Sequence, residues 1–478
     1  MFAAGDHARP QGHISHRTFV HWLDMDKNFS ATDIRTQITS DKDRIFADLK
    51  EIVAFNSVHN EPGCEEDHRA AGQWVEKALS QAGLSVSAYP TEDGSTAYIG
   101  TREAAAGQPT VLLYCHYDVV PAGDQANWES DPFTLTERNG RWYGRGAADC
   151  KGNLAMHLAA LRAVDAAGGA KVGIKVLVEG SEERGGAGLD RLIETQPELF
   201  KADAIMIADS GNVAAGVPTL TTSLRGGAQV DLQVDTLKTP VHSGSFGGAA
   251  PDATFALIRL INSLRDENGA VAIDGVDCTR HWDGYAYSQE DFRKDATILD
   301  GVAIMGGEDD DVASQVWSRP AISVTGFTST PVAEAVNAVP ATAKARLNLR
   351  VPAGLDTTDV LEKLEKHLHA HVPFGAKLTV SIADANQPFH TSPDGKVGTL
   401  LGRCLSEAYD GKETVVVGSG GSIPLCSALE AAVPGAEIAL YGVEEPECTI
   451  HSPNESVSPD EIIAIATTEA LFLLNYQK

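Results

Sequence analysis

Three short apolar runs, separated by helical patterns, constrain the fold of this chain most strongly. The runs are 111–115, 172–178 and 204–208, and aliphatic residues dominate them. Apolar residues recur at helical spacing near 153–167 and 186–196. Strands that alternate with helices predict a largely parallel sheet that is buried on both faces.

The chain changes character in the middle and then returns to the first pattern. Segments 228–235 and 344–351 alternate apolar and polar residues, as half-buried antiparallel strands do. From about residue 390 the buried pattern resumes. Further helices are expected near 43–56, 65–82, 252–265, 357–370, 397–409 and 459–475, and further strands near 414–417 and 438–441.

These patterns predict an α/β chain of two domains, which also suits a length of 478 residues. The main domain is expected over 29–223 and 389–478, with a mostly parallel mixed sheet flanked by helices. Residues 224–388 are expected to form an inserted α+β domain with an antiparallel sheet, serving as a lid or in dimerisation. Residues 1–28 lack the apolar core of a signal peptide, so we expect a flexible tail, or an over-long start with Met25 as the true initiator.

Net charge and cysteine usage narrow the classes of function. Lys and Arg number 38 against 66 Asp and Glu, which gives a formal net charge of −28. Such an acidic surface repels phosphate backbones and anionic membranes, so nucleic-acid and membrane partners are not expected. The seven cysteines form no Cys-x-x-Cys pair, and no apolar run is long enough to span a bilayer. A reducing compartment, the cytoplasm, is therefore predicted.

Polar residues follow the predicted strands at their carboxyl ends. His116 follows the strand at 111–115, and Asp118 can hold the other ring nitrogen of this imidazole and fix its tautomer. Asp149 lies within Gly144–Gly152, whose glycines expose it at the start of the next helix. Each of these features has a structural explanation when it is taken singly, such as an aspartate that caps a helix.

Two further strands and a distant loop add to this set. The second apolar run leads to Glu182 and Glu183, and adjacent carboxylates beside a metal can divide the work, one binding the ion and the other accepting a proton from water. Asp209 follows the third run, and His451 follows the last predicted strand. Imidazoles and carboxylates without a thiolate predict two divalent ions that share a carboxylate, Zn²⁺ first, with Mn²⁺ or Co²⁺ as alternatives.

These motifs resemble those of the co-catalytic metallopeptidases, which include carboxypeptidase G, the aminoacylases, succinyl-diaminopimelate desuccinylase and the carnosinases. The similarity runs from about residue 40 onward. It is greatest to the branch of carnosinase and the cytosolic non-specific dipeptidase, on the motifs Glu290–Asp295, Trp317–Pro320 and Gly420–Pro424. The resemblance implies hydrolysis of dipeptides or short peptides by a metal-activated water, and a homodimer as the working unit.

The resemblance also implies how the metals are held. His116, Asp149 and Asp209 would hold one ion, and Asp149 would bridge to the second. Glu183 and His451 would complete the ligands of that second ion.

Other roles follow from the same resemblance. Glu182 would be the general base, and Asp118 would support His116. His242, from the inserted domain, would stabilise the oxyanion. The residues implied to bind the substrate are Arg350, Asn337, Gly420, Gly421 and Ser422.

The chain departs from that branch at a place that bears on the substrate. Close relatives carry Arg-Glu before Gly-Gly-Ser, whereas Gly418 and Ser419 stand here, so a cation expected to bind the substrate carboxylate is missing. The metal ligands do not separate a dipeptidase from an N-acyl-amino-acid deacylase or a related amidohydrolase, and that alternative stays open. An inactive metal-binding or scaffold protein is a second alternative, but the retention of Glu182, which has no role as a ligand, argues against it.

Overall fold

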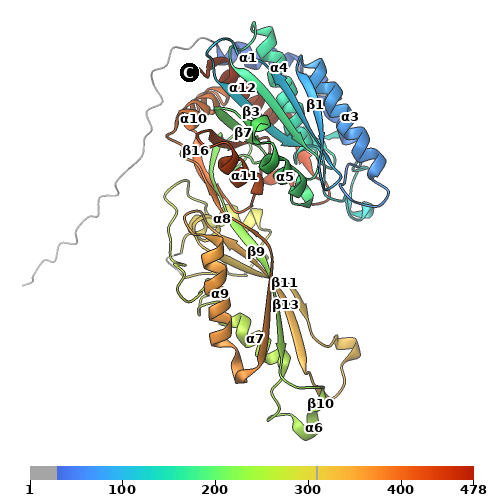
Figure 1. The fold of residues 1–478 in the computed structure, drawn as a ribbon, viewed down its shortest axis with the longest axis vertical. Helices are drawn as coiled ribbons and strands as arrows, with labels where there is room; N and C mark the ends of the chain where they lie inside the picture. Colours follow the sequence, from blue (N-terminus) through green and yellow to red (C-terminus); the bar gives the residue numbers. More distant parts are fainter. Residues whose placement is uncertain (1–28, 308–309, 478) are drawn as a thin grey trace, which may run out of the picture.

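The computed structural model describes residues 29–307 and 310–477, so the tail predicted over 1–28 lies outside the described residues. The described chain forms a large mixed sheet with helices on both faces and a separate antiparallel sheet, displaced along the long axis of the molecule (Figure 1). The predicted fold class, a mixed α/β sheet flanked by helices plus an antiparallel sheet, is confirmed.

The main sheet has nine strands. In sheet order they are β1 (Ser85–Pro90), β2 (Thr96–Arg102), β6 (Gly173–Glu179), β3 (Thr110–His116), β7 (Ala204–Ala208), β17 (Glu437–Tyr441), β8 (Thr219–Leu224) and β15 (Phe389–His390), with β16 (Val415–Ser419) beside β8. The central strands β6, β3, β7 and β17 run parallel to one another, and so do β16 and β8. The outer pairs β1–β2, β2–β6 and β8–β15 are antiparallel.

Helices cover both faces of the main sheet. Along β3 the side chains of Val111, Leu113 and Cys115 are buried under one layer of helices. Leu112 and Tyr114 are buried under the other layer. Burying each aliphatic side chain contributes about 1.5–3 kcal/mol, so the strand is held from both sides. The first layer consists of α1 (Ala31–Ser40), α2 (Lys42–Val53), α3 (Glu65–Gln81), α4 (Lys151–Ala166), α10 (Lys396–Ala408) and α12 (Pro459–Asn475), and the second of α5 (Ala187–Thr195) and α11 (Pro424–Ala432).

A four-stranded antiparallel sheet forms the centre of the inserted segment, which we define as residues 224–388. Its strands, in sheet order, are β11 (Ala321–Thr328), β13 (Thr342–Val351), β9 (Gly226–Asp235) and β14 (Lys377–Asn386). Val230, Leu232 and Val234 of β9 are buried in one core with residues of α7 (Ala253–Asn262) and α9 (Thr357–His371). The residues between them on β9 are only partly buried, as expected of a sheet with one covered face.

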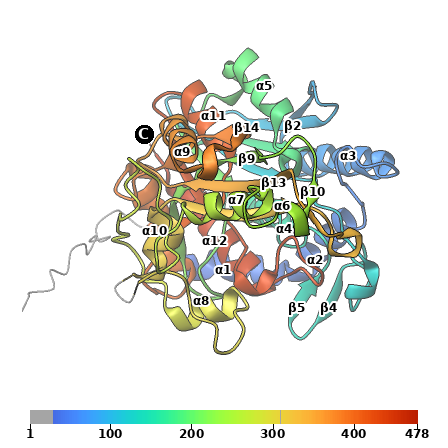
Figure 2. The same ribbon diagram turned by 90° about the horizontal axis from the view of Figure 1, so that it is seen from below.

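Shorter elements lie around these two sheets. At the end of the inserted segment farthest from the main sheet, β10 (Val241–His242) pairs with β12 (Ala338–Val339) beside α6 (Ser243–Phe246) (Figure 1). The view from that end shows α6 and α7 in front of the main sheet (Figure 2). The helix α8 (Gln289–Asp295) also belongs to the inserted segment. A small sheet of β18 (Ser456–Val457), β5 (Arg141–Tyr143) and β4 (Thr136–Arg138) completes the main part.

Every helix and strand predicted from the sequence is present, with ends that differ by at most three residues. The strand at 204–208 and the helix at 459–475 have the predicted ends. Among the longer elements, the patterns did not predict α1, α8, α11, β1, β2, β8, β11 or β14. None of the described helices combines the length and the apolar character that crossing a membrane requires.

Candidate metal centre and substrate cleft

The carboxyl ends of the parallel strands bring the predicted metal ligands together. His116 is the last residue of β3, and Asp209 directly follows β7. Glu183 lies in the turn after β6, His451 in the loop after β17, and Asp149 just before α4. Because these strands are parallel neighbours, their carboxyl ends meet at one edge of the sheet, where open α/β sheets place their sites.

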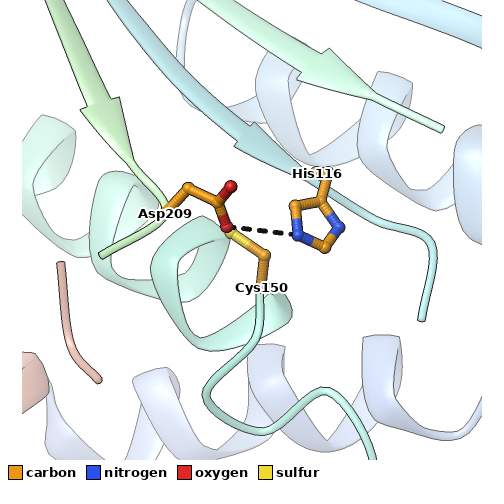
Figure 3. Close-up of side chains that lie close together, drawn as sticks. All are labelled: His116, Cys150 and Asp209. Carbon is orange, nitrogen blue, oxygen red and sulfur yellow. Dashed lines mark ion pairs between the residues drawn. The ribbon is translucent and has the colours of Figure 1, made fainter. Parts of the chain in front are cut away.

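Asp149 lies at the centre of this cluster, with a histidine on each side of its carboxylate. Its Oδ1 is 3.0 Å from His116 Nε2, and its Oδ2 is 3.0 Å from His451 Nε2. His116 Nε2 also lies 3.3 Å from Asp209 Oδ1, and His451 Nε2 lies 3.1 Å from Glu183 Oε2. The five side chains therefore form two groups that share Asp149, and Figure 3 shows His116 and Asp209 of the first group facing each other.

Asp118 is buried and holds both His116 and the glutamate pair. Its backbone oxygen is 3.1 Å and its carboxylate oxygen 3.3 Å from His116 Nδ1. The same carboxylate accepts hydrogen bonds from the backbone N–H groups of Glu182, at 3.1 Å, and Glu183, at 3.0 Å. One side chain thus orients an imidazole and anchors the backbone of both glutamates at the cluster.

A second buried carboxylate, that of Glu455, joins the loop of Asp149 to the loop of His451. It accepts hydrogen bonds from the backbone N–H groups of Gly146, at 2.9 Å, and of Ala148 and Asp149, both at 3.1 Å. His451 is held at a φ of 61°, a left-handed conformation that residues other than glycine adopt only where their surroundings enforce it.

The cluster concentrates acidic groups in a buried place. Burial raises the pKa of Glu182 well above its ordinary range, and the neighbouring Asp209 carboxylate raises it further. Burial likewise raises the pKa values of Glu183 and Asp209. Oε1 of Glu183 is buried and has no hydrogen-bond partner among the described residues. A donor set of carboxylates and imidazoles with an orphaned oxygen fits divalent cations, which would compensate this charge.

Cys150, which directly follows Asp149, also lies at the cluster, although no role was predicted for it. Its side chain is close to His116 and Asp209 (Figure 3). The thiol donates a hydrogen bond to the Ala208 carbonyl at 3.1 Å, and burial raises its pKa well above the usual range. The nitrogen and oxygen donors of the cluster therefore lie beside one thiol whose proton is held by a backbone carbonyl.

Glu444 is a further acidic residue that the sequence analysis missed. Its carboxylate and those of Asp149 and Asp209 offer oxygens within 4.8 Å of one another. Asn153 Nδ2 donates a hydrogen bond to Glu444 Oε1 at 3.1 Å. The sequence signal for it was the acidic pair Glu444-Glu445 after the last strand, which alone is typical of a solvated loop.

A cleft of about 980 Å³ leads away from these ligands. Its wall includes Glu182, which belongs to neither histidine-centred group, and the acidic residues Asp291 and Asp295 of α8. The predicted substrate-binding residues Gly420, Gly421 and Ser422 also line it. The structure thus places the predicted base and the predicted substrate loop on one cleft.

Two guanidinium groups lie at the substrate loop, and neither is paired with an acidic residue of the described chain. Arg350 Nη1 donates a hydrogen bond to Ser422 Oγ at 2.9 Å, and Arg225 Nε donates one to the Gly420 carbonyl at 3.3 Å. Arg225 Nη1 is buried and has no partner among the described residues. Burial, and then the charge of Arg350, lower the pKa of Arg225 to about 10. Two uncompensated like charges at a cleft are expected to attract an anion.

Arg225 was not predicted from the sequence. It lies at the junction between the two sheets, between Leu224 of β8 and Gly226 of β9. The sequence did hold a signal for this arginine. Gly418 replaces the cation expected at the loop, and Arg225 offers another cation at the predicted junction of the two domains.

His242 and Asn337 are not brought to the metal ligands of their own chain. Both are exposed and belong to the tip formed by β10, β12 and α6, far from the main sheet (Figure 1). They are close to each other, since the backbone N–H of Ser243 donates a hydrogen bond to the Asn337 carbonyl at 2.9 Å. Their predicted roles in oxyanion stabilisation and substrate binding stay predictions.

Comparison with known proteins identifies the family. Residues 112–475 match the profile of Peptidase family M20/M25/M40. The chain belongs to this family. It is a metallopeptidase, so the predicted enzyme class is confirmed, and membership of this family implies that the cluster binds divalent metal.

Several members of this family with similar chains are dipeptidases. The cysteinylglycine-S-conjugate dipeptidase of Corynebacterium striatum is 52% identical over 455 residues, which cover 95% of this chain and 100% of that protein. The Cys-Gly metallodipeptidase dug1 of Schizosaccharomyces pombe is 29% identical, over 74% of this chain and 77% of that protein. The solved structure of human carnosine dipeptidase 1 has the same fold, with a TM-score of 0.77 at 23% identity over 93% of this chain and 98% of that chain. The predicted resemblance to the carnosinase and dipeptidase branch is confirmed.

Asp149→Ala should lose at least one bound metal ion, because both histidine-centred groups share this carboxylate. The melting temperature in metal-containing buffer should fall toward that of the metal-stripped wild type, since bound ions stabilise the folded chain. Elemental analysis and thermal unfolding measure the two effects. Asp165→Ala, on the surface of α4, is the matched control and should keep the wild-type values. An unchanged metal content in Asp149→Ala would show that Asp149 is not the bridge.

Proposed function

We propose that this M20-family enzyme is a dipeptidase that requires a free carboxylate at the end of its substrate. The arrangement of the cleft carries this proposal: Glu182 lies beside the metal ligands, and the uncompensated guanidinium groups of Arg225 and Arg350 lie at the loop 418–422. We also propose that S-conjugates of Cys-Gly are among its substrates. The 52% identity to a dipeptidase of that name supports this second proposal.

Acidic side chains on the cleft favour a dipeptide over an N-acyl amino acid. Asp291 and Asp295 line it, beside Glu447, which is paired with Lys294 at 3.7 Å. Carboxylates attract the free ammonium group of a dipeptide, whereas an N-acyl group offers them no charge. We therefore place the deacylase alternative second.

Two divalent ions are proposed for the cluster, zinc first, because imidazole and carboxylate ligands suit it, with manganese or cobalt as substitutes. His116, Asp149 and Asp209 would hold one ion. Asp149, Glu183 and His451 would hold the other. When bound, the ions lower the pKa of a water molecule and polarise the peptide carbonyl.

Glu182 is proposed to move the proton. Its carboxylate accepts the proton of the attacking water and delivers it to the leaving amine. Asp118 anchors the backbone at Glu182 and Glu183, so the base and the neighbouring ligand keep a fixed separation.

Arg225 and Arg350 are proposed to bind the substrate carboxylate together with Ser422. Arg225 then replaces the cation that relatives carry at the position of Gly418. Its backbone N–H donates to the Gly421 carbonyl at 3.1 Å, and the Ser422 hydroxyl donates to the Arg225 carbonyl at 2.5 Å. These bonds fix the guanidinium against the loop, and the orphaned Nη1 supplies a donor for a carboxylate oxygen.

A homodimer is proposed as the working unit. His242 lies at the tip of the inserted segment, and its Nδ1 accepts a hydrogen bond from the backbone N–H of Ser245 at 3.2 Å. A second copy that packs against the inserted segment could place this tip over the first copy's cleft. There the imidazole would stabilise the oxyanion, with Asn337 beside it.

We also propose the predicted domain boundaries and a location in the cytoplasm. The backbone passes between the two sheets at 224–226 and 386–389, which supports an inserted domain over 224–388 between the two halves of the catalytic domain, 29–223 and 389–478. All seven cysteines are unpaired, as is usual in a reducing compartment.

Glu182→Gln should lower kcat by about 100- to 10,000-fold, because the amide cannot accept a proton from water. Its metal content should equal that of the wild type. Steady-state kinetics on Cys-Gly and elemental analysis test both statements, with Glu194→Gln, exposed on α5, as the control. A parallel loss of metal and activity would mean that Glu182 is itself a ligand.

Arg225→Met should raise KM for dipeptides about 10- to 100-fold, which corresponds to one lost hydrogen bond between charged groups. Hydrolysis of the same dipeptides as C-terminal amides should be slow in the wild type and unchanged by the substitution. Arg346→Met is the control, since Arg346 on β13 is already paired with Asp231 at 2.6 Å. If Arg225→Met slowed the hydrolysis of the free dipeptides and of their C-terminal amides equally, Arg225 would support the loop without binding the substrate carboxylate.

Mixing His242→Ala chains with Glu182→Gln chains should restore activity if His242 acts across a dimer. Each heterodimer would contain one site with both groups intact, so random exchange should return up to about a quarter of wild-type activity. The measurement is kcat after subunit exchange, with heterodimer formation checked by native mass spectrometry. No recovery from verified heterodimers would contradict the assignment.

A further inference from the structure

Three side chains that can bind metal lie together on the inserted segment, outside the catalytic cluster. His367 and His371 are four residues apart on α9, so both emerge from the same face of the helix. Asp274, from the loop after α7, places Oδ2 2.8 Å from His371 Nε2 and 3.2 Å from His367 Nδ1. Across 29–307 and 310–477 this is the one such group that shares no residue with the catalytic cluster.

The spacing of these atoms matches that at the catalytic cluster. There, the nitrogen and oxygen atoms that face each other are 3.0–3.3 Å apart. The two imidazoles of α9 stack, with ring centroids 4.1 Å apart, which brings both within reach of one carboxylate. Two histidines at this helical spacing are a common source of paired zinc ligands.

The tautomer of buried His367 is fixed in the form that can bind a metal. The Ser263 hydroxyl donates its proton to the Leu260 carbonyl at 2.7 Å, so its oxygen accepts a hydrogen bond from His367 Nε2 at 3.1 Å. Nδ1 therefore carries a lone pair and faces Asp274. A partner on the far nitrogen is the usual support of a metal-binding histidine.

The surroundings leave room for an ion, and among the described residues that line them the arginine is paired with a carboxylate. A cavity of about 630 Å³ is lined by the three residues and by Asp277 and Cys278. Arg319, on the same cavity, is neutralised by Asp310 at 2.5 Å. The backbone N–H of Asp274 donates to His367 Nδ1 at 3.1 Å, and a bound ion would take the place of this hydrogen bond.

We propose that Asp274, His367 and His371 form a structural site for a zinc-like divalent cation, with water completing its coordination. The ion links the loop after α7 to α9 and so fastens one edge of the inserted segment. This proposal does not depend on the dipeptidase function. It adds one ion to those held at the catalytic cluster.

The test is the zinc content of the full chain after loading and dialysis, measured by inductively coupled plasma mass spectrometry. His371→Ala should hold one zinc ion per chain fewer than the wild type. His369→Ala is the matched control, because His369 is exposed on the same helix and its ring lies 4.0 Å from Glu365. The His369→Ala variant should keep the wild-type zinc content. Added zinc should raise the melting temperature of His369→Ala more than it raises that of His371→Ala.

Asp274→Ala is a second variant, on an exposed loop, and should lose the same ion. The kcat and KM of both variants should equal those of the wild type, since the site lies outside the catalytic cleft. Equal zinc content in the wild type, His371→Ala and Asp274→Ala would overturn the proposal and leave a hydrogen-bonded cluster only.

Discussion

The metal centre depends on one buried carboxylate, that of Glu455. It gathers three backbone N–H groups around Asp149 and the guanidinium of Arg145, which is 2.6 Å away and itself buried. The groups it joins are up to 310 residues apart in the sequence. Without this carboxylate, each buried donor would lose its hydrogen-bond partner, which costs about 1–3 kcal/mol of folding free energy per donor. Asp149 and His451 would then no longer be held in fixed positions relative to each other.

The acidic metal cluster and the two guanidinium groups at the loop 418–422 belong to different parts of the fold. The carboxylates of the metal cluster belong to the edge of the main sheet, whereas Arg350 extends from β13 of the inserted segment and Arg225 from the junction. If the carboxylates of the cluster formed ion pairs with these two arginines, both charges would be neutralised. The carboxylates would then not attract a metal cation, and the arginines would not attract a substrate carboxylate. Their separation across two sheets leaves each free for a ligand of the opposite charge.

Sequence patterns predicted the elements whose residues are buried over a continuous stretch of the chain. The strand ending at Ala208 is apolar throughout, and its neighbours supplied most ligand positions because ligands follow strand ends. The edge strand β1 was missed because most of its residues are exposed and carry no alternating pattern. Arg225 and Glu444 were missed because their partners come from distant segments. No periodicity could reveal that the tip carrying His242 lies away from its own cleft.

The position of α12 in the fold determines the order in which the two parts of this protein can fold. This helix is buried along almost its whole length against α4 and α10, and it follows His451 and Glu455 in the chain. A nascent chain on the ribosome can complete the inserted segment first, since all strands of that sheet have already emerged. The part of the main sheet that α12 covers stays exposed until this helix emerges, so the main part completes its folding after the inserted segment.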